Sequence, residues 1–344
     1  MSHGFARRNF ASAPATVTGW QRPEEWLALP RPNVGDHKAV GLFAVTNGNN
    51  YVAIECSGQF AVDWGDGLGP QAYTNSCEKN LGWGDYSAST LTSRGYRQAV
   101  VTVTPRGTGV FDGLDFSLKH SAAASNSQVN WLDVIVSGPN ISTASLFYRN
   151  NGQQSRMLEQ FELVGVTSQT NMSNMFYSCS SLQSVPALNT ANVTNMSNMF
   201  QSCSSLQSVP VLNTANVSSM ASMFYGCSSL QSVPALNTAN VTNMSYMFQY
   251  CSSLQSVPVL NTANVTNMAS MFQSCSSLQS VELTGCVIDI AVNNCRLEGP
   301  ALNALYASLG TPGSTRTINV TGNPGTPFDN PTIATAKGWT VTGS

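Results

Sequence analysis

The chain has 344 residues, with 15 Lys and Arg against 17 Asp and Glu, and a formal net charge of −2. Charged residues make up 9% of it, so there is no basic stripe of the kind that marks nucleic-acid binding. No apolar run is long enough to cross a membrane, and the first ten residues lack the apolar core of a signal peptide. We therefore expect a protein of two or three domains that is assembled in the cytoplasm, without nucleic acid and without membrane insertion.

Residues 1–36 are rich in Ala, Pro, Arg and aromatic residues and show little periodicity. We interpret them as an extended N-terminal arm. Two arrangements are open: the arm folds back on its own domain, or it docks on a partner through aromatic anchors and charged contacts. The candidate docking residues are Phe5, Arg7, Arg8, Phe10, Trp20 and Trp26.

Residues 37–120 have the character of a small all-β domain. Runs of β-branched and aromatic residues at 39–45 and 51–56 flank a turn signal at 46–50, which predicts two strands. Further strands are expected near 95–104 and 113–118. The motif Val-Asp-Trp-Gly-Asp-Gly at 62–67, followed at a distance by a Tyr and the valines of 96–103, resembles PKD-type domains. That resemblance implies a β-sandwich.

Two carboxylates in this motif, Asp63 and Asp66, are candidates for a calcium site or an acid/base pair. The competing interpretation is structural. In a tight Gly-Asp-Gly turn, the carboxylates accept hydrogen bonds from local backbone N–H groups. We favour the turn.

The stretch 161–281 is a tandem array with a period of 24 residues, which indicates a solenoid. In one copy, apolar residues from Val193 to Cys203 recur at steps of three and four, as on one face of a helix. Asn192 or Thr194 could cap that helix. Leu206, Val209 and Val211 follow with the spacing of a leucine-rich-repeat strand. Each copy is therefore predicted to form a short parallel strand, a turn and a short helix, giving an α/β solenoid.

The repeat motif Val-Thr-Asn-Met-Ser-x-Met-Phe-x-x-Cys-Ser-Ser-Leu at 193–206 resembles the BspA-like leucine-rich repeats of bacterial surface proteins and some phage virion proteins. Segments 22–30 and 318–341 also look like parts of BspA-like phage structural proteins. The resemblance implies a leucine-rich-repeat solenoid and, for the whole chain, a place in a virion: tail, fibre, spike or head surface.

The array is flanked by divergent turns. Strands are expected at 131–136 and 157–163, with Val134 one period before Leu158, so we assign 121–344 to the solenoid. Regular repeats take up 168–281. Residues 282–344 are expected to form a C-terminal cap, with a helix that has Pro300 in its first turn and a last short helix ending at Gly338.

Nine cysteines could indicate a disulfide scaffold, but five of them recur with the repeat, at Cys179, Cys203, Cys227, Cys251 and Cys275. We predict that these five form a buried ladder of thiols that pack as small apolar side chains. Cys56 and Cys77 could bridge, although a protein assembled in the cytoplasm would usually keep them reduced. No pair has the close spacing of a zinc site.

The sequence offers few residues that could carry out catalysis. No Asp, Glu, Lys, Arg or His lies between Glu162 and Glu282, so the array has no general acid or base. The three histidines lie in no recognisable motif. A glycoside hydrolase would need paired carboxylates, which the array does not offer. We predict no enzymatic activity, no cofactor and no metal.

The array instead exposes rows of Asn, Ser, Thr and Gln, which suit neutral partners because such groups cost less to desolvate than charges. Departures from the repeat consensus indicate where a ligand would bind. Tyrosines replace small polar residues or Gln at several outward positions, and the alternative is drift between copies without function. The candidate ligand-binding residues are Tyr177, Tyr225, Tyr246, Tyr250 and Gln249.

Three functions are compared. The first, favoured by the resemblance and the arm, is a non-enzymatic virion structural protein that contacts other virion proteins through its arm and a host glycan or protein through its solenoid, or that only decorates and stabilises the capsid. Fibres and spikes are often homo-oligomers, so one is expected here. The second is a bacterial cell-surface adhesin, and the third is a hydrolase acting on host polysaccharide.

Overall fold

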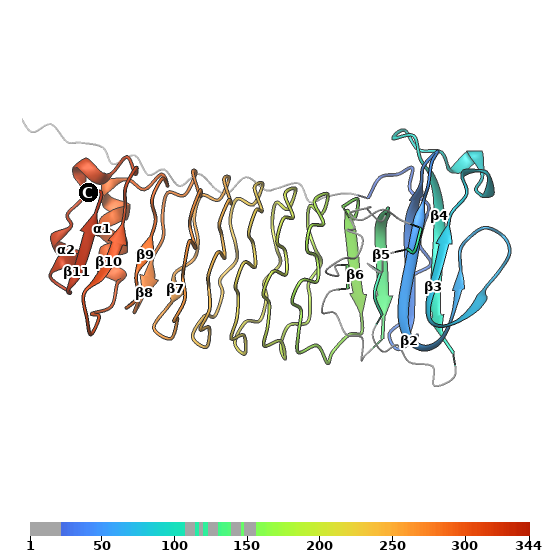
Figure 1. Cartoon of the computed structure of the whole chain (residues 1–344), viewed down its shortest axis with the longest axis horizontal. Helices are drawn as coiled ribbons and strands as arrows, with labels where there is room; N and C mark the ends of the chain where they lie inside the picture. Colours follow the sequence, from blue (N-terminus) through green and yellow to red (C-terminus); the bar gives the residue numbers. More distant parts are fainter. Residues whose placement is uncertain (1–21, 107–113, 117–119, 123–129, 139–145, 148–155) are drawn as a thin grey trace, which may run out of the picture.

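The computed structural model describes residues 22–106, 114–116, 120–122, 130–138, 146–147 and 156–344. The molecule is elongated (Figure 1). A twisted sheet lies at one end, a β-solenoid of about seven turns follows, and short helices cover the other end. The fold is therefore mostly sheet and is not the α/β solenoid that the sequence predicted.

The N-terminal sheet has six strands in the order β3-β2-β4-β1-β5-β6. Strands β1 to β4 are joined in antiparallel pairs. β1, β2 and β4 lie where strands were predicted, whereas β3 is mostly polar and was not predicted. β5 is antiparallel to β1 and parallel to β6, so the sheet changes here from hairpin-like pairing to solenoid-like pairing. The strand bounds are β1 Lys38–Val45, β2 Tyr51–Asp63, β3 Gln71–Asn80, β4 Arg97–Pro105, β5 Trp131–Ser137 and β6 Gln160–Val164. Two 3-10 turns, Trp83–Asp85 and Ala88–Thr90, connect β3 to β4.

The predicted N-terminal β-sandwich is not confirmed, because the strands described for residues 38–164 belong to one sheet. One face of that sheet packs on the core that continues into the solenoid. The other face is covered by residues 22–36, which we call the strap. Trp26 of the strap packs with Leu42, Tyr96 and Leu132 in a small second core. An irregular segment thus takes the place of a second sheet.

The entry to the solenoid differs in register from the prediction. β5 and β6 are parallel neighbours, but Val134 pairs with Phe161, three residues beyond the predicted Leu158. A strict 24-residue offset holds only where the repeat motif is intact, for example between Asn195 and Ser219. The offset between β5 and β6 is therefore three residues longer than the repeat.

The helix predicted in each repeat is wrong. Asn198 and Ser202 have left-handed backbone conformations, with φ of 58° and 61°, and their counterparts in the other regular coils do too. Two left-handed residues four positions apart in each coil cannot belong to an α-helix, in which every residue is right-handed. The segment is instead a series of tight turns, in which the amide of Cys203 donates to the carbonyl of Phe200 at 3.1 Å.

Alternate amides in these turns point to the next coil. Phe200 N–H donates to the carbonyl of Met223 at 2.9 Å, and Ser202 N–H to that of Tyr225 at 2.7 Å. Asn192 and Thr194 do not cap a helix, as had been expected. Their side chains donate backwards, Thr194 to the carbonyl of Thr170 at 3.1 Å and Asn192 to that of Thr167 at 3.4 Å. Side chains and backbone therefore tie each coil to both neighbours.

The interior of the solenoid is built from columns of identical residues. The rings of Phe176, Phe200, Phe224, Phe248 and Phe272 stack with centroids 5.4 to 5.8 Å apart and planes within 12° of parallel. The repeat cysteines form the predicted ladder of buried thiols, and each of the last four donates to a Phe carbonyl of the preceding coil, at 3.0 to 3.1 Å. The apolar spacing of three and four residues thus marks a buried face, as predicted, but of turns and not of a helix.

The phenylalanine stack continues through Phe147 and Phe116 to the N-terminal sheet. A single core therefore runs from the sheet to the cap. The domain limits at 36, 120 and 281 remain a prediction, since the described contacts pass across the last two without a break.

The C-terminal cap contains a parallel sheet in the order β11-β10-β9, with helix α1 beside it. α1 has Pro300 in its first turn, as predicted, and Lys337 covers its last carbonyls by donating to Ala307 at 2.6 Å and Leu309 at 2.8 Å. The remaining elements are β7 Leu260–Asn261, β8 Leu283–Thr284, β9 Ile290–Ala291, α1 Gly299–Ser308, β10 Arg316–Asn319, a 3-10 turn Thr326–Phe328, α2 Thr332–Thr335 and β11 Trp339–Thr342.

Candidate functional site

Three of the predicted tyrosines lie on adjacent coils of the solenoid. The rings of Tyr225 and Tyr250 meet edge to face, with centroids 5.4 Å apart and planes at 84°. Tyr225 therefore lies against Tyr250 of the following coil, as expected for a tyrosine one repeat back. Tyr246 and Tyr250 are 42% and 44% exposed, which is high for aromatic side chains. We call Tyr225, Tyr246 and Tyr250 the tyrosine cluster.

The backbone at the tyrosine cluster is unusual. Tyr246 and Tyr250 occupy left-handed positions, with φ of 59° and 63°, so they are not one helical turn apart as predicted. Other coils place Asn, Ser or Gly at these positions, and small or short polar residues tolerate the conformation better. A bulky side chain there costs about 1–3 kcal/mol. Because residues held in such conformations cluster at functional sites, Tyr246 and Tyr250 are candidates for one.

Gln249 has a supporting place in the cluster. Its side chain is buried, and its amide donates to the side-chain oxygen of Gln273 in the next coil. The amides of Tyr246 and Tyr250 donate to the next coil as well, to Ala269 at 2.8 Å and Gln273 at 2.9 Å. The buried side chain of Gln249 thus links its coil to the next one, and its part in ligand binding stays a prediction.

Tyr177 is not part of the cluster. It occupies the same coil position as Tyr225, two coils nearer the N-terminal end, with Gln201 between them. Neighbouring coils are about 4.8 Å apart, so the two tyrosines are about 10 Å apart along the axis. One ligand could reach both only if it extended along the solenoid.

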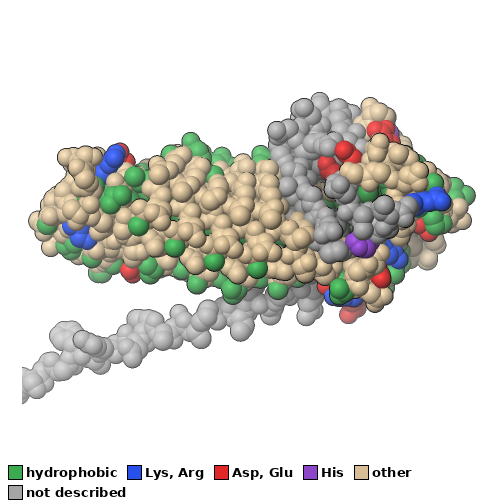
Figure 2. All heavy atoms as spheres, turned by 90° about the horizontal axis from the view of Figure 1, so that it is seen from below, with side chains coloured by type: hydrophobic (Ala, Val, Ile, Leu, Met, Phe, Trp, Pro, Cys, Tyr) green, Lys and Arg blue, Asp and Glu red, His purple; other side chains and the backbone are tan. Residues whose placement is uncertain are grey.

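The surface around the tyrosine cluster carries no charge. Figure 2 shows the solenoid as mostly tan, with red and blue side chains gathered towards the two ends. Exposed Asn and Thr side chains use their donors internally: Asn240 donates to Ala215 at 2.7 Å, and Thr242 to Ser218 at 3.2 Å. Their orientation is therefore fixed, and their oxygen lone pairs remain open to solvent.

The predicted docking arm is only partly described. Phe5, Arg7, Arg8, Phe10 and Trp20 lie outside the described residues. Trp26 is 4% exposed, and its Nε1 donates to the hydroxyl of Tyr96 at 3.1 Å. Between residues 22 and 36, the chain thus folds back on its own sheet, which was one of the two arrangements considered. Trp26 is an anchor within the chain.

Asp63 and Asp66 hold the turn after β2, as predicted. Asp63 accepts from the amide of Gly65 at 2.9 Å, and Asp66 from that of Leu68 at 3.1 Å. Asp66 also pairs with Lys79. Burial alone would raise the pKa of Asp66, but its bonds to Lys79 and Leu68 outweigh burial and lower it. In the part of the chain that is described, no three His, Cys, Asp or Glu side chains gather as metal ligands.

All nine cysteines are buried and unbridged, Cys56 and Cys77 included. Burial raises the pKa of Cys77 to about 12 and that of Cys295 to about 12. Burial also raises the pKa of each repeat thiol. A thiol that remains protonated is a poor nucleophile and metal ligand, so the cysteines serve packing.

The repeat region is similar to a known family. Residues 143–259 and 170–284 match the family described as Mycoplasma protein of unknown function, DUF285. A search of curated proteins found no match. The family match and the solenoid are consistent with a BspA-like repeat protein. None of the helices in the described ranges combines the length and apolar character that a membrane span needs.

Proposed function

We propose that this protein is a non-enzymatic structural protein of a phage virion that binds a neutral host-surface glycan through the tyrosine cluster. The observation that carries the proposal is the pair Tyr246 and Tyr250, exposed and held in left-handed positions that other coils give to Asn, Ser or Gly. Aromatic faces pack on the C–H faces of sugars, while fixed amide and hydroxyl oxygens accept from sugar hydroxyls. The uncharged surroundings favour a neutral ligand.

The first experiment tests sugar binding. Methyl glycosides of glucose, galactose and N-acetylglucosamine are presented to the full chain, and saturation transfer to each sugar is measured by NMR. The triple variant Tyr225→Gln/Tyr246→Asn/Tyr250→Ser restores residues that other coils use, so it should fold. We expect stronger transfer with the native protein than with the variant; equal transfer in the two would contradict the tyrosine cluster as the site.

The second experiment tests location. Support for a virion comes from the resemblance of segments 22–30, 193–206 and 318–341 to phage structural proteins. Quantitative mass spectrometry of purified particles should find the protein in a fixed ratio to the capsid protein. Finding the protein only in infected-cell lysate, and not in purified particles, would contradict the proposal that it is a virion protein.

A cell-surface adhesin is the second candidate, and the family match favours it, because that family is described from Mycoplasma, a cellular organism. The binding surface would be the same. Labelling of intact cells with an antibody against the solenoid distinguishes the two, since a virion protein is absent from the surface of uninfected cells.

A further inference from the structure

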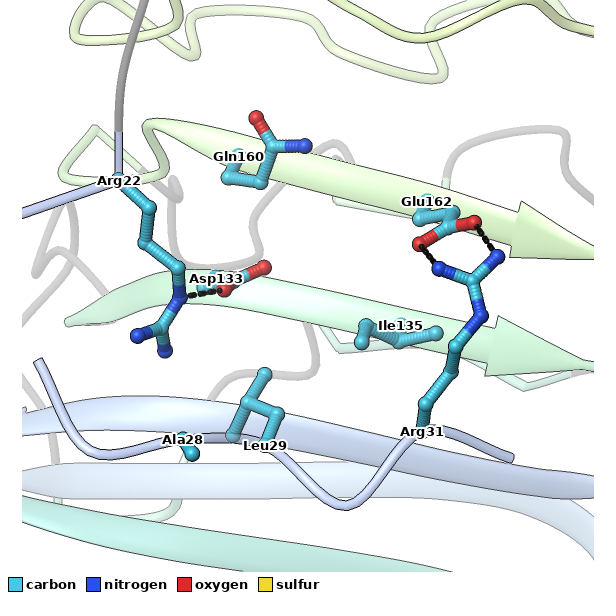
Figure 3. A pocket seen from close by; sticks show the side chains of 8 residues that line it. All are labelled: Arg22, Ala28, Leu29, Arg31, Asp133, Ile135, Gln160 and Glu162. Carbon is cyan, nitrogen blue, oxygen red and sulfur yellow. Dashed lines mark hydrogen bonds and ion pairs between the residues drawn. The ribbon is translucent and has the colours of Figure 1, made fainter.

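A second concave site lies between the strap and the sheet, far along the chain from the tyrosine cluster. A cavity of about 390 Å³ is bounded by strap residues on one side and by outward-facing residues of β5 and β6 on the other (Figure 3). Its volume is within the range of small-molecule sites. Its lining residues are Arg22, Ala28, Leu29, Arg31, Asp133, Ile135, Gln160 and Glu162.

An ion pair lies towards each end of the cavity (Figure 3). Arg22 Nε donates to Asp133 Oδ2 at 2.9 Å, and Arg31 makes a two-pronged pair with Glu162, one bond of which is 2.9 Å. The other guanidinium nitrogens of Arg22 donate to strap carbonyls. The cavity therefore carries two positive and two negative groups and has no net charge.

One oxygen in this cavity lacks a partner. The side chain of Asp133 is 5% exposed, and its Oδ1 is buried without a hydrogen bond. In Figure 3 that oxygen points away from Arg22. A buried acceptor left unpaired costs about 1–3 kcal/mol. Burial also raises the pKa of Asp133, although Arg22 opposes the shift, so Arg22 alone does not fully compensate the carboxylate.

Gln160 stands beside this oxygen. It pairs with Asp133 in the register of β5 and β6, so both side chains rise from the same face of the sheet. Gln160 offers an amide donor and an acceptor, while Ile135 and Leu29 supply an apolar wall. A fitting ligand must donate to Asp133, exchange bonds with Gln160 and place carbon against the wall. It must also be uncharged, because a cation would compete with the arginines and an anion with the carboxylates.

We infer that this cavity binds a neutral polyhydroxylated ring of monosaccharide size, with a ligand hydroxyl donating to Asp133 Oδ1. Hydroxyl groups both donate and accept, and the C–H face of a pyranose is apolar, so one sugar meets each requirement. The site is independent of the tyrosine cluster.

The test uses the full chain and three probes: methyl β-D-galactopyranoside, ethanolamine as a cation and acetate as an anion. Two-dimensional NMR follows the side-chain amide of Gln160 and the backbone amides of β5 and β6 during titration. The glycoside should shift these signals saturably, and the charged probes should not. A larger response to ethanolamine, or no response to the glycoside, would overturn the inference.

Two variants and a control assign the contacts. Gln160→Leu keeps the size of the side chain and should weaken glycoside binding at least tenfold with an unchanged melting temperature. Gln207→Leu makes the same change at a half-exposed position of the array and should bind as the native protein does. Asp133→Asn should also weaken binding. If Gln160→Leu lowers the melting temperature but leaves binding intact, Gln160 stabilises the fold beside Asp133 and does not contact a ligand, and the inference fails.

The triple tyrosine variant separates this site from the proposed function. It should retain the shifts at Gln160. Shifts at Gln160 in both proteins together with equal saturation transfer in both would remove only the proposed function. Transfer that falls in the variant while Gln160 shows no shift in either protein would remove only this second site.

Discussion

The N-terminal sheet and the solenoid are stabilised in different ways although they share one core. In the sheet, distant segments meet through individual pairs, such as Arg22 with Asp133, Arg94 with Glu159 and Lys79 with Asp66. In the array, the Phe stacking and the Cys hydrogen bonds are repeated from coil to coil, and residues 163–281 carry no charge. A substitution in the sheet therefore removes one specific pair, whereas a substitution in the array breaks a continuous stack of identical side chains. The predictions below test this difference.

The largest effect is expected from Phe224→Ala. The ring stacks on Phe200 at 5.7 Å and on Phe248 at 5.6 Å, and all three are fully buried. Loss of a buried Phe side chain costs about 3–5 kcal/mol of unfolding free energy. Urea denaturation followed by circular dichroism measures the loss. The control, Phe328→Ala, alters a side chain that is 78% exposed and should change little; equal losses would mean that the column has no special role.

Asp66→Asn probes the sheet side of the comparison. The native pKa of Asp66 is lowered below the ordinary 3.8, so its ionised form stabilises the fold above that pH, and this contribution is lost as the pH falls through the native pKa. We expect the variant to be about 1.5–3 kcal/mol less stable at pH 7, because a charged hydrogen bond is removed. The difference should shrink towards pH 3. A difference that does not depend on pH would show that charge is not its cause.

Restoring residues of other coils at the tyrosine cluster should act in the opposite direction. Tyr246→Asn/Tyr250→Ser removes two bulky residues from left-handed positions. Asn and Ser still occupy that conformation, so only part of the cost is recovered, and the free energy of unfolding should rise by about 1–2 kcal/mol. Thermal denaturation measures the change. Tyr225→Gln serves as the control, since Tyr225 does not have a positive φ. A loss of stability in the double variant would mean that packing of the two rings stabilises the fold by more than the left-handed backbone costs.

The smallest effect is expected for the thiols. Because all nine are buried and burial raises the pKa of each repeat thiol, none should react with a disulfide reagent at pH 8 in the native protein. All nine should react in denaturant. Rapid native reaction of Cys56 or Cys77 alone would show that the sheet opens more readily than the array.

The period of 24 residues predicted the solenoid and its buried Met, Phe and Cys columns. A repeat can be recognised from the sequence alone, and residues one period apart stack in a solenoid. The helix was wrong because the same spacing of three and four also results from left-handed residues at every fourth position, such as Asn198 and Ser202. The recurrence of Asn, Ser and Gly at these positions is the sequence feature that could have indicated the left-handed conformation.

The cavity beside the strap could not be predicted, because it depends on long-range pairing. Arg22 and Asp133 are 111 residues apart, and no local pattern links them. The sandwich prediction failed for a similar reason: strand propensities identified β1, β2 and β4, but not β3 and not what covers the second face of the sheet. The tyrosine cluster was found because Tyr246 and Tyr250 depart from the repeat.

In the turns, one backbone amide donates to a carbonyl of its own coil and the next donates to a carbonyl of the following coil. This pattern has a consequence for how the number of repeats evolves. Every internal coil offers its successor the same set of donors and acceptors, so a whole coil could be gained or lost without a mismatched join. Unequal recombination between near-identical stretches of the gene would then lengthen or shorten the rod in steps of one coil. Related strains should carry arrays of different length, with the sheet and the cap unchanged at the two ends.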